Sequence, residues 1–464
     1  IVVETENTSD VAQHRDVGDV DVCGTDCEDP VPAAEEDATV DAPVNVTADA
    51  TADASFDATA DAPIDEPEPE PVWDCGGFVC DEVNVNATLG QARAIDGCHF
   101  ELAFEAPLAE GQALAERLLE RLEGAGVGSR RSMPQILSSL NRVGRAGLSN
   151  ATQTRLSGLN PVGFRWNTGD ENVSYWYPQG ITGSSDTSAD DRYEGRRLVM
   201  TSWYHKTDER PTRGVRISLA DITDLGDVTY RHMLLVDPVE TADGPDYGPA
   251  EYDSGNALHA GGIVWIGEYL YVVDTVRGIR IYDLSRIFRL SHVDDTTRIG
   301  ISGDRSDAHG YRYAIPRIAR YRLTSDSCAV RFAFVGLERD SIPPVFVTGE
   351  YFSDHPNGKV VTWPVDPQTG LLEARQGTTR ATQSVVIGQT RAQGALRVQD
   401  RFYVSSSSQD GSNGRLYTLR PGQANTSVNW VYGAEDLYHE RGPDLVWTTA
   451  EHPGSRDVVA IPRP

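Results

Sequence analysis

Three runs of residues follow one another between positions 197 and 237: RLVMTSWY (197–204), GVRISLADI (214–222) and TYRHMLLVD (229–237). In the middle run apolar residues alternate with polar or small ones, which is the period of a strand with one buried face, and the other two runs are short apolar stretches of strand length. The residues between the runs include Asp, Pro and Gly, which favour turns. A short phrase, Gln179-Gly180-Ile181, precedes the first run. The stretch therefore predicts a set of four neighbouring antiparallel strands.

Strand candidates continue in sets of four towards residue 464, and most sets open with a short phrase of small or apolar residues. The second set is GGIVW (261–265), YLYVVDT (269–275), GIRIYDL (278–284) and AIPRIARYRL (314–323). The third is RFAFVGL (331–337), PVFVTGEY (344–351), KVVTWPV (359–365) and SVVIG (384–388). The fourth is QGALRV (393–398), RFYVSSS (401–407), RLYTLRP (415–421) and VNWVYG (428–433). Repeated four-stranded sets predict an all-β fold, a β-propeller over residues 161–464.

The last set, EDLYHE (435–440), DLVWTTAE (444–451) and DVVAIPR (457–463), is one strand short. Residues 164–167 or 173–177, just before the first set, would supply the missing strand and close the ring. Closure of that kind removes a free sheet edge. We expect five four-stranded blades with long loops, and six blades is the alternative.

Residues 75–160 have a different pattern and are expected to form a small module that is bounded by cysteines and partly helical. Leu108–Leu122 has apolar residues at helical spacing, with Gly124 and Gly126 to end the helix. Ser132–Val143 reads as a second helix, with Ser132 as its N-cap and Pro134 in the first turn.

Residues 1–74 hold 22 Asp and Glu against one Arg, so 21 of the 29 net negative charges lie there. Asp, Ala, Thr, Pro and Glu dominate residues 37–71, a composition that buries too little apolar surface to fold. We expect a disordered acidic stalk, which resembles the stalks of bacterial surface lipoproteins and implies a lipid anchor upstream. The folded part is only mildly acidic and shows no basic track for nucleic acid. No apolar run is long enough for a membrane span.

Five of the six cysteines precede residue 100, where a hydrophobic core is least expected. They are Cys23, Cys27, Cys75, Cys80 and Cys98, with Cys328 alone in the C-terminal part. This distribution favours disulfides in an oxidising compartment over zinc, because the spacings differ from the usual zinc-binding pairs. We expect the two local pairs, Cys23–Cys27 and Cys75–Cys80, together with a Cys98–Cys328 bond.

The strand-opening phrases place polar side chains where the innermost strands of different blades converge on the propeller axis. These candidate ligand-binding residues are Gln179, His259, Gln393, Glu435 and Asp436. In one interpretation they bind a ligand or a metal ion. In the other they satisfy backbone donors around a narrow channel.

The sequence contains candidates for two further kinds of site, a pair of catalytic carboxylates and a calcium site. Hydrolysis of a glycosidic bond needs two carboxylates at a defined separation, and the candidates at strand ends are Glu194, Asp274, Glu350, Glu435 and Glu451. Calcium is the one cofactor suggested, because Asn167, Asp170 and Asn172 cluster in an oxygen-rich turn. Neither pattern matches a complete motif.

Several phrases resemble a family of exported bacterial propeller proteins of unassigned function: YWYPQGI (175–181), YEGR (193–196) with TSWY (201–204), YRHMLLV (230–236), HAGG (259–262) followed by YLYVVDT (269–275), and EHPGSR (451–456). The resemblance covers residues 161–464 and implies a fold and export, with no established activity. We therefore expect a secreted or cell-surface module that binds an extracellular glycan or protein. The alternatives are a secreted polysaccharide hydrolase or lyase, and a structural subunit of an extracellular assembly.

Overall fold

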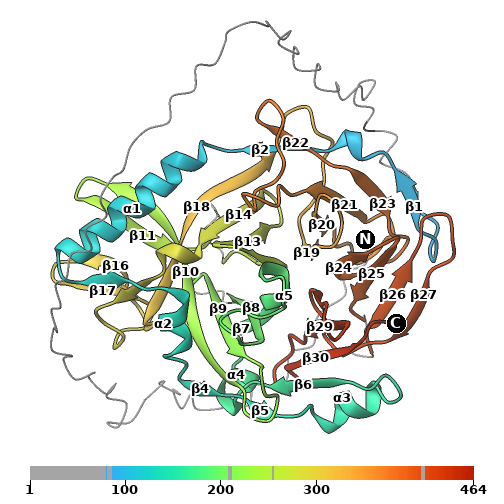
Figure 1. Cartoon of the computed structure of the whole chain (residues 1–464), viewed down its shortest axis with the longest axis horizontal. Helices are drawn as coiled ribbons and strands as arrows, with labels where there is room; N and C mark the ends of the chain where they lie inside the picture. The colour runs from blue at the N-terminus through green and yellow to red at the C-terminus, as the bar shows by residue number, and fades with distance from the viewer. Residues whose placement is uncertain (1–79, 81–85, 207–211, 253–254, 256, 409–412) are drawn as a thin grey trace, which may run out of the picture. The chain divides into compact units, whose positions relative to one another are not determined.

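The computed structural model describes residue 80 and residues 86–206, 212–252, 255, 257–408 and 413–464. The stalk expected over residues 1–74, with Cys23 and Cys27, and also Cys75, lies outside these residues. The described part belongs to one compact unit, residues 72–464. It is mostly strand, as the period-2 pattern predicts (Figure 1).

The strands fall, within the described residues, into five antiparallel sets of four, numbered here from inner to outer strand. Set 1 is β7 (Trp176–Gly183), β8 (Leu198–His205), β9 (Val215–Asp221) and β10 (Thr229–Thr241); set 2 is β12 (Ile263–Ile266), β13 (Tyr269–Asp274), β14 (Gly278–Asp283) and β18 (Tyr313–Leu323). Set 3 is β19 (Phe334–Glu338), β20 (Val345–Gly349), β21 (Lys359–Pro364) and β23 (Gln383–Val386); set 4 is β24 (Ala392–Val398), β25 (Arg401–Ser406), β26 (Arg415–Leu419) and β27 (Thr426–Asn429). Set 5 is β28 (Tyr438–Glu440), β29 (Leu445–Thr449), β30 (Asp457–Pro462) and β6 (Val162–Arg165).

The ring closes as the sequence predicts. The outer strand of set 5 is β6, which precedes set 1 in the chain and pairs antiparallel with β30. The first of the two predicted segments thus completes the set, whereas the second contributes to the inner strand β7. Because the first and last parts of the propeller share one sheet, neither end of the ring has a free edge at this junction.

Sets 1 and 2 are joined at their outer strands, unlike the others. Leu234–Val236 of β10 pairs in parallel with Ala314–Pro316 of β18. Short elements extend the sheet and its surroundings here: β11 (Gly244–Pro249), η3 (Leu284–Arg286), β15 (Phe288–Leu290), β16 (Ile299–Ser302) and β17 (Arg305–Ala308). These residues form the lobe on the left of Figure 1.

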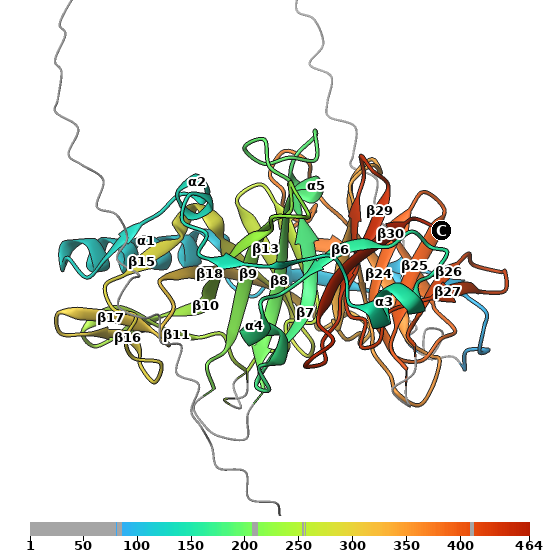
Figure 2. The same cartoon turned by 90° about the horizontal axis from the view of Figure 1, so that it is seen from below.

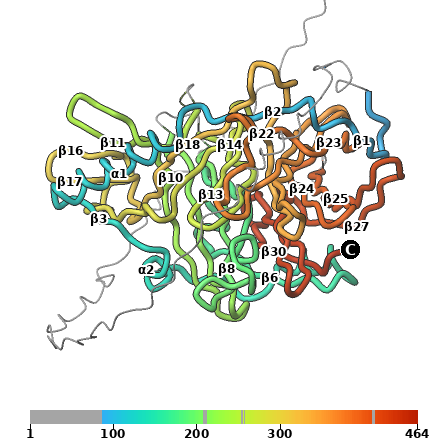
Figure 3. The backbone as a smooth tube through the Cα atoms, turned by 45° about the horizontal axis from the view of Figure 1, so that its top comes forward, coloured from blue at the N-terminus to red at the C-terminus, as the bar shows by residue number. Residues whose placement is uncertain are grey.

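Residues 86–160 do not form a core apart from the propeller; they run around its outside and are called the peripheral strap below (Figures 1 and 3). Four of its strands add to outer strands: β1 (Arg93–Ile95) to β23, β2 (Glu101–Phe104) to β18, β4 (Arg142–Val143) to β10, and β5 (Arg145–Ala146) to β6. Its other elements are η2 (Gly97–His99), α1 (Leu108–Gly124), β3 (Gly128–Arg130), α2 (Met133–Leu137) and α3 (Asn150–Arg155). The strap covers edges that would otherwise expose unpaired backbone groups.

The predicted first helix is confirmed as α1, whose buried face, Leu118, Leu119 and Leu122, packs in one cluster with residues of β10, β11 and β15. The second helix is much shorter than predicted. Ser132 is the N-cap, as predicted, and forms a capping box with Gln135, but the helix ends at Leu137. Residues 142–143 then pair with β10 as β4, because the outer edge of set 1 offers backbone partners that a longer helix would leave uncovered.

Cys328 pairs with Cys80, not with Cys98, and this corrects the predicted connectivity. The predicted Cys75–Cys80 bond is excluded by the same observation. Cys98 is itself disulfide-bonded, and among the described residues no cysteine is free. Cys80 reaches Cys328 because the strap lies beside set 2, a proximity that the order of residues in the chain does not reveal.

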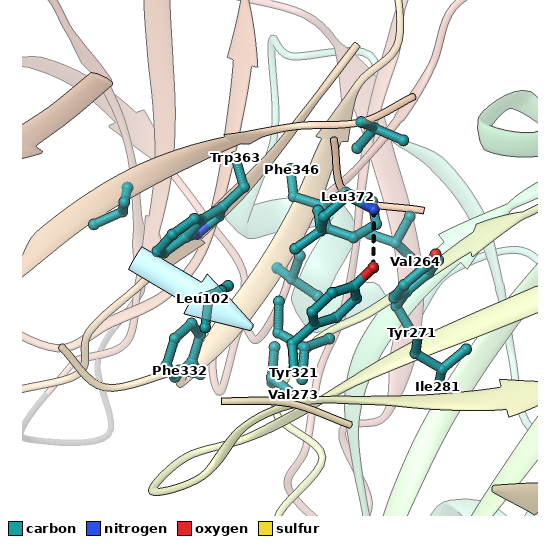
Figure 4. Close-up of a cluster of buried hydrophobic side chains, with 14 of the residues drawn as sticks. Leu102, Val264, Tyr271, Val273, Ile281, Tyr321, Phe332, Phe346, Trp363 and Leu372 are labelled. Atoms are coloured by element: carbon teal, nitrogen blue, oxygen red, sulfur yellow. Dashed lines mark hydrogen bonds between the residues drawn. The ribbon is translucent and has the colours of Figure 1, made fainter. Parts of the chain in front are cut away.

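A large buried cluster lies between sets 2 and 3 (Figure 4). Trp363, Phe346 and Phe332 are fully buried there. The Tyr321 hydroxyl accepts a hydrogen bond of 3.1 Å from the backbone N–H of Leu372, so the buried phenol is satisfied. In the part of the chain that the structure describes, no helix is both long and apolar enough to cross a membrane.

Candidate functional site

The inner strands approach one another closely at the axis, and glycines make this possible. A methyl group on Gly180 of β7 would lie 2.8 Å from the backbone nitrogen of Ile263, just inside set 2. One on Gly394 of β24 would lie 2.6 Å from the Cα of Asp436. The phrases predicted from the sequence do meet at one end of the axis. This end, with Gln179, His259, Gln393 and Glu435 around it, is called the axial mouth.

Asp436 lies below the mouth and connects three inner strands. Its Oδ2 accepts hydrogen bonds of 3.3 Å from the backbone N–H groups of Ile181 and Ile263. Burial raises the pKa of Asp436 well above its usual value, although these N–H donors oppose the shift. Its Oδ1 is buried with no hydrogen-bond partner among the described atoms. Asp436 thus satisfies backbone donors, as the structural interpretation of the sequence predicted.

Glu435 and Glu451 form the carboxylate pair of the mouth, and each is held by an amide. Gln393 Nε2 donates to Glu435 Oε1 at 3.1 Å, and Gln179 Nε2 donates to Glu451 Oε2 at 3.2 Å. Burial, then Glu451, then Asp436 raise the pKa of Glu435 well above its usual value. Glu435 is 1% exposed, whereas the Glu451 side chain is 22% exposed. Solvent therefore reaches Glu451 and barely touches Glu435.

An aromatic wall stands beside this pair. The rings of Tyr204 and His259 stack with centroids 4.5 Å apart, and the Tyr177 ring lies 5.7 Å from that of Tyr204. Burial, then Glu451, then Glu435 raise the pKa of Tyr204, so Tyr204 connects the wall to the carboxylates. Lys206 Nζ lies 4.8 Å from the centre of the Tyr177 ring.

His259 presents its side chain to solvent at the rim of the mouth. The dense protein around the ring and, second, the Lys206 ammonium group lower its pKa. Because the ring itself is exposed, water weakens both effects. The neutral imidazole is favoured at neutral pH.

Arg456 supports the mouth from below. Its Nε donates to the backbone carbonyl of Glu451 at 2.9 Å, and its guanidinium lies 5.2 Å from the Tyr177 ring and 5.5 Å from the Trp203 ring. Burial and, second, Arg216 lower its pKa to about 10, so it remains a cation. One buried residue thus orients both Tyr177 and the backbone of Glu451.

Tyr177, Tyr204, Lys206 and Arg456 were not singled out as site residues from the sequence. Three of them, Tyr177, Tyr204 and Arg456, lie in phrases that carried the family resemblance: YWYPQGI, TSWY and EHPGSR. The resemblance of these phrases to a known family was the signal in the sequence that could have identified the residues. Tyr204 lies near the end of β8 and Lys206 directly follows the strand, and the antiparallel pairing of β8 with β7 places Tyr204 opposite Tyr177.

The proposed calcium residues do not converge on a common point. Asn167 caps α4 (Thr168–Asn172) by accepting from the backbone N–H of Asp170, and Asn172 Nδ2 donates to the carbonyl of Thr168. Asp170 points into the core, where Arg216 Nη2 donates to its Oδ1 at 3.0 Å. Within the described ranges no three His, Cys, Asp or Glu side chains are grouped as metal ligands. Buried cations take up the Asp170 oxygens that calcium would need.

The other carboxylate candidates lie away from Glu435 and Glu451 or are already paired. Asp274 is fully buried and lies 2.9 Å from Arg280 Nη2. Glu350 lies 2.9 Å from Lys359 Nζ, and Glu194 is exposed in a loop. The structure therefore brings together only one pair of the predicted carboxylates, Glu435 with Glu451.

No family model and no curated relative matches this chain. Solved structures that resemble it include a β-xylosidase, RS223 (TM-score 0.32, 10% identity, 65% of this chain and 94% of that chain). A GH43_1 enzyme from Xanthomonas citri has a TM-score of 0.32 and 8% identity over 67% of this chain and 93% of its own. A hydrazine synthase of Kuenenia stuttgartiensis has a TM-score of 0.29 and 11% identity over 60% and 75%. Likenesses this remote carry no inference about activity.

Proposed function

We propose that the protein is an extracellular or cell-surface propeller that binds a carbohydrate at the axial mouth. The observation that carries the proposal is the joining of an aromatic wall to a half-buried carboxylate, with Tyr177 and Tyr204 beside Glu451. Aromatic faces pack against the C–H faces of sugar rings, and carboxylate and amide groups bond hydroxyls. A Cys80–Cys328 disulfide supports an oxidising compartment.

A second candidate function is hydrolysis of a glycosidic bond. It is favoured by Glu435, a buried carboxyl near Glu451 whose pKa is raised by burial and by Glu451, because a raised pKa favours the protonated form that a general acid needs. Substrate reaches Glu435 only if the surrounding side chains move, since it is 1% exposed. Binding without turnover is therefore the first proposal.

The test is a glycan array with the full chain, followed by calorimetry on the glycans that bind. Glu451→Gln removes a charged acceptor, and we expect affinity to fall about tenfold or more. Glu194→Gln removes an exposed carboxylate away from the mouth and should leave affinity unchanged. The proposal fails if no glycan binds, or if Glu451→Gln binds as tightly as the wild type.

Release of reducing sugar from each bound glycan separates the two functions. Hydrolysis requires release by the wild type that Glu435→Gln abolishes. That variant should also be more stable than the wild type at pH 8, because a buried carboxyl with a raised pKa costs stability above its unfolded-state pKa. Tight binding with no release leaves the protein a binding module.

A further inference from the structure

A second cavity lies at the other end of set 2. Its volume is about 210 Å³, and several separate elements line it: Arg130, Arg131, Ser132, Met133, Pro134, Tyr193, Trp265, Gly267, Glu268, Leu284 and Ser285. The start of β12 lies near the axial mouth. Trp265 lies towards the other end of the strand, and Gly267 directly follows the strand. Figure 2 shows α2 and α5 (Ser184–Thr187) on one side of the molecule and α4 on the other. The cavity is therefore separate from the mouth.

The floor of the cavity is aromatic and apolar. Tyr193 and Trp265 lie with ring centroids 5.1 Å apart, and Met133 and Leu284 are each 4% exposed. Trp265 Nε1 already donates to the carbonyl of Gly267 at 2.8 Å, so the indole presents no unmet donor to the cavity. Such a floor suits a flat apolar group.

The rim supplies a cation that other groups do not neutralise. Arg130 is paired with Glu116, which also binds Arg286. The Arg131 guanidinium donates only to the backbone carbonyl of Arg130, at 2.7 Å, and no carboxylate pairs with it among the described residues. A half-buried guanidinium without an anion is the group that binds a carboxylate through two parallel hydrogen bonds.

We propose that this cavity binds a small carboxylate that carries a flat apolar ring, an aromatic acid. The ring packs on Tyr193 above Trp265, and the carboxylate accepts hydrogen bonds from Arg131. Glu268 is the acidic residue of the lining and is exposed. Its charge repels the carboxylate, so removing it should strengthen binding or leave it unchanged.

Titration calorimetry with phenylacetate and the full chain tests the proposal, with phenethylamine as the cation of similar shape. Phenylacetate should bind and phenethylamine should not. Arg131→Gln should weaken phenylacetate binding about tenfold or more, and Tyr193→Ala should weaken it while Tyr193→Phe retains it. Arg192→Gln is the matched control, since Arg192 is exposed in the loop that holds Tyr193 and, among the described residues, its guanidinium donates only to the nearby Gly195 carbonyl.

Three results would overturn the proposal: no heat with phenylacetate, equal affinity in Arg131→Gln, or preferential binding of phenethylamine that Glu268→Gln abolishes. The last would identify an amine site. Melting temperatures of all variants are measured alongside, and Tyr193→Phe keeps the ring interpretation testable if Tyr193→Ala unfolds.

Discussion

At the scale of one residue, Asp170 lies in a polar stretch of the sequence, but its side chain is part of the buried core. Arg142, Arg216 and the Tyr230 hydroxyl donate to its two oxygens. Arg216 in turn lies between two tryptophans, with ring centres at 4.8 and 4.6 Å. Burial alone would raise the pKa of Asp170, but His232 and these arginines overcome it and hold the pKa well below its usual value.

Replacing Asp170 with Asn should destabilise the fold by about 3–5 kcal/mol, because Arg216 would remain buried without its charge partner. Urea unfolding measures the change. The control is Asp400→Asn, whose exposed ion pair with Arg420 should contribute less than about 1 kcal/mol. Equal stability of the two variants would contradict this account of the core.

The buried cluster around Asp170 also predicts that the stability of the fold decreases in acid. Burial and, second, Arg216 lower the pKa of His232 from 6.5 to about 3. Below pH 6.5 the unfolded chain takes up a proton at this residue that the folded chain does not, so stability should fall as pH decreases. The lowered pKa of Asp170 acts in the same direction at still lower pH. Unfolding midpoints between pH 7.5 and 4.5 check this, and His232→Gln should flatten the dependence.

At the scale of elements, a disulfide joins the segment ahead of the peripheral strap to the loop that follows β18. Cys80 and Cys328 are separated by 248 residues, and Cys328 is 1% exposed within the hydrophobic cluster between sets 2 and 3. The bond restricts the unfolded chain over most of the propeller. Its effect is therefore expected on global stability rather than on local structure.

The double variant Cys80→Ala, Cys328→Ala should lose up to about 5 kcal/mol of unfolding free energy in the chain-entropy model. Because both thiols are removed together, no unpaired cysteine complicates the measurement. Urea unfolding of the two proteins under non-reducing conditions gives the difference. An unchanged midpoint would show that the strap is held by strand pairing alone.

At the scale of the whole molecule, the strap adds a strand to four of the five outer strands, and β27 is the exception among the described residues. Near β27 the strap makes only a single bridge, Gln91 with Ala424. The outer edge of Thr426–Asn429 consequently lacks the backbone partners that the other sets have.

Hydrogen exchange should report this difference directly. We expect the amides of Thr426–Asn429 to exchange faster than those of β10, β18, β23 and β6 at the positions where strap strands pair. Mass spectrometry of peptic peptides from the native full chain measures the rates. Protection of Thr426–Asn429 equal to that of the covered strands would mean that another segment pairs with this edge.

The sequence by itself determined the strands, the helix over Leu108–Gly124 and the closing of the ring by residues before set 1. These follow from local periodicity and turn chemistry, which neighbouring residues carry. It also indicated the phrases that meet at the axis, because a repeated set places equivalent positions together.

Only the tertiary structure decided which groups those positions face. It paired Cys80 with Cys328, turned Asp170 towards Arg216 rather than a metal, and brought Tyr204 beside Glu451. Each of these contacts joins residues far apart in the chain. Their proximity depends on how the sets and the strap pack around the ring, and no local pattern in the sequence encodes that packing.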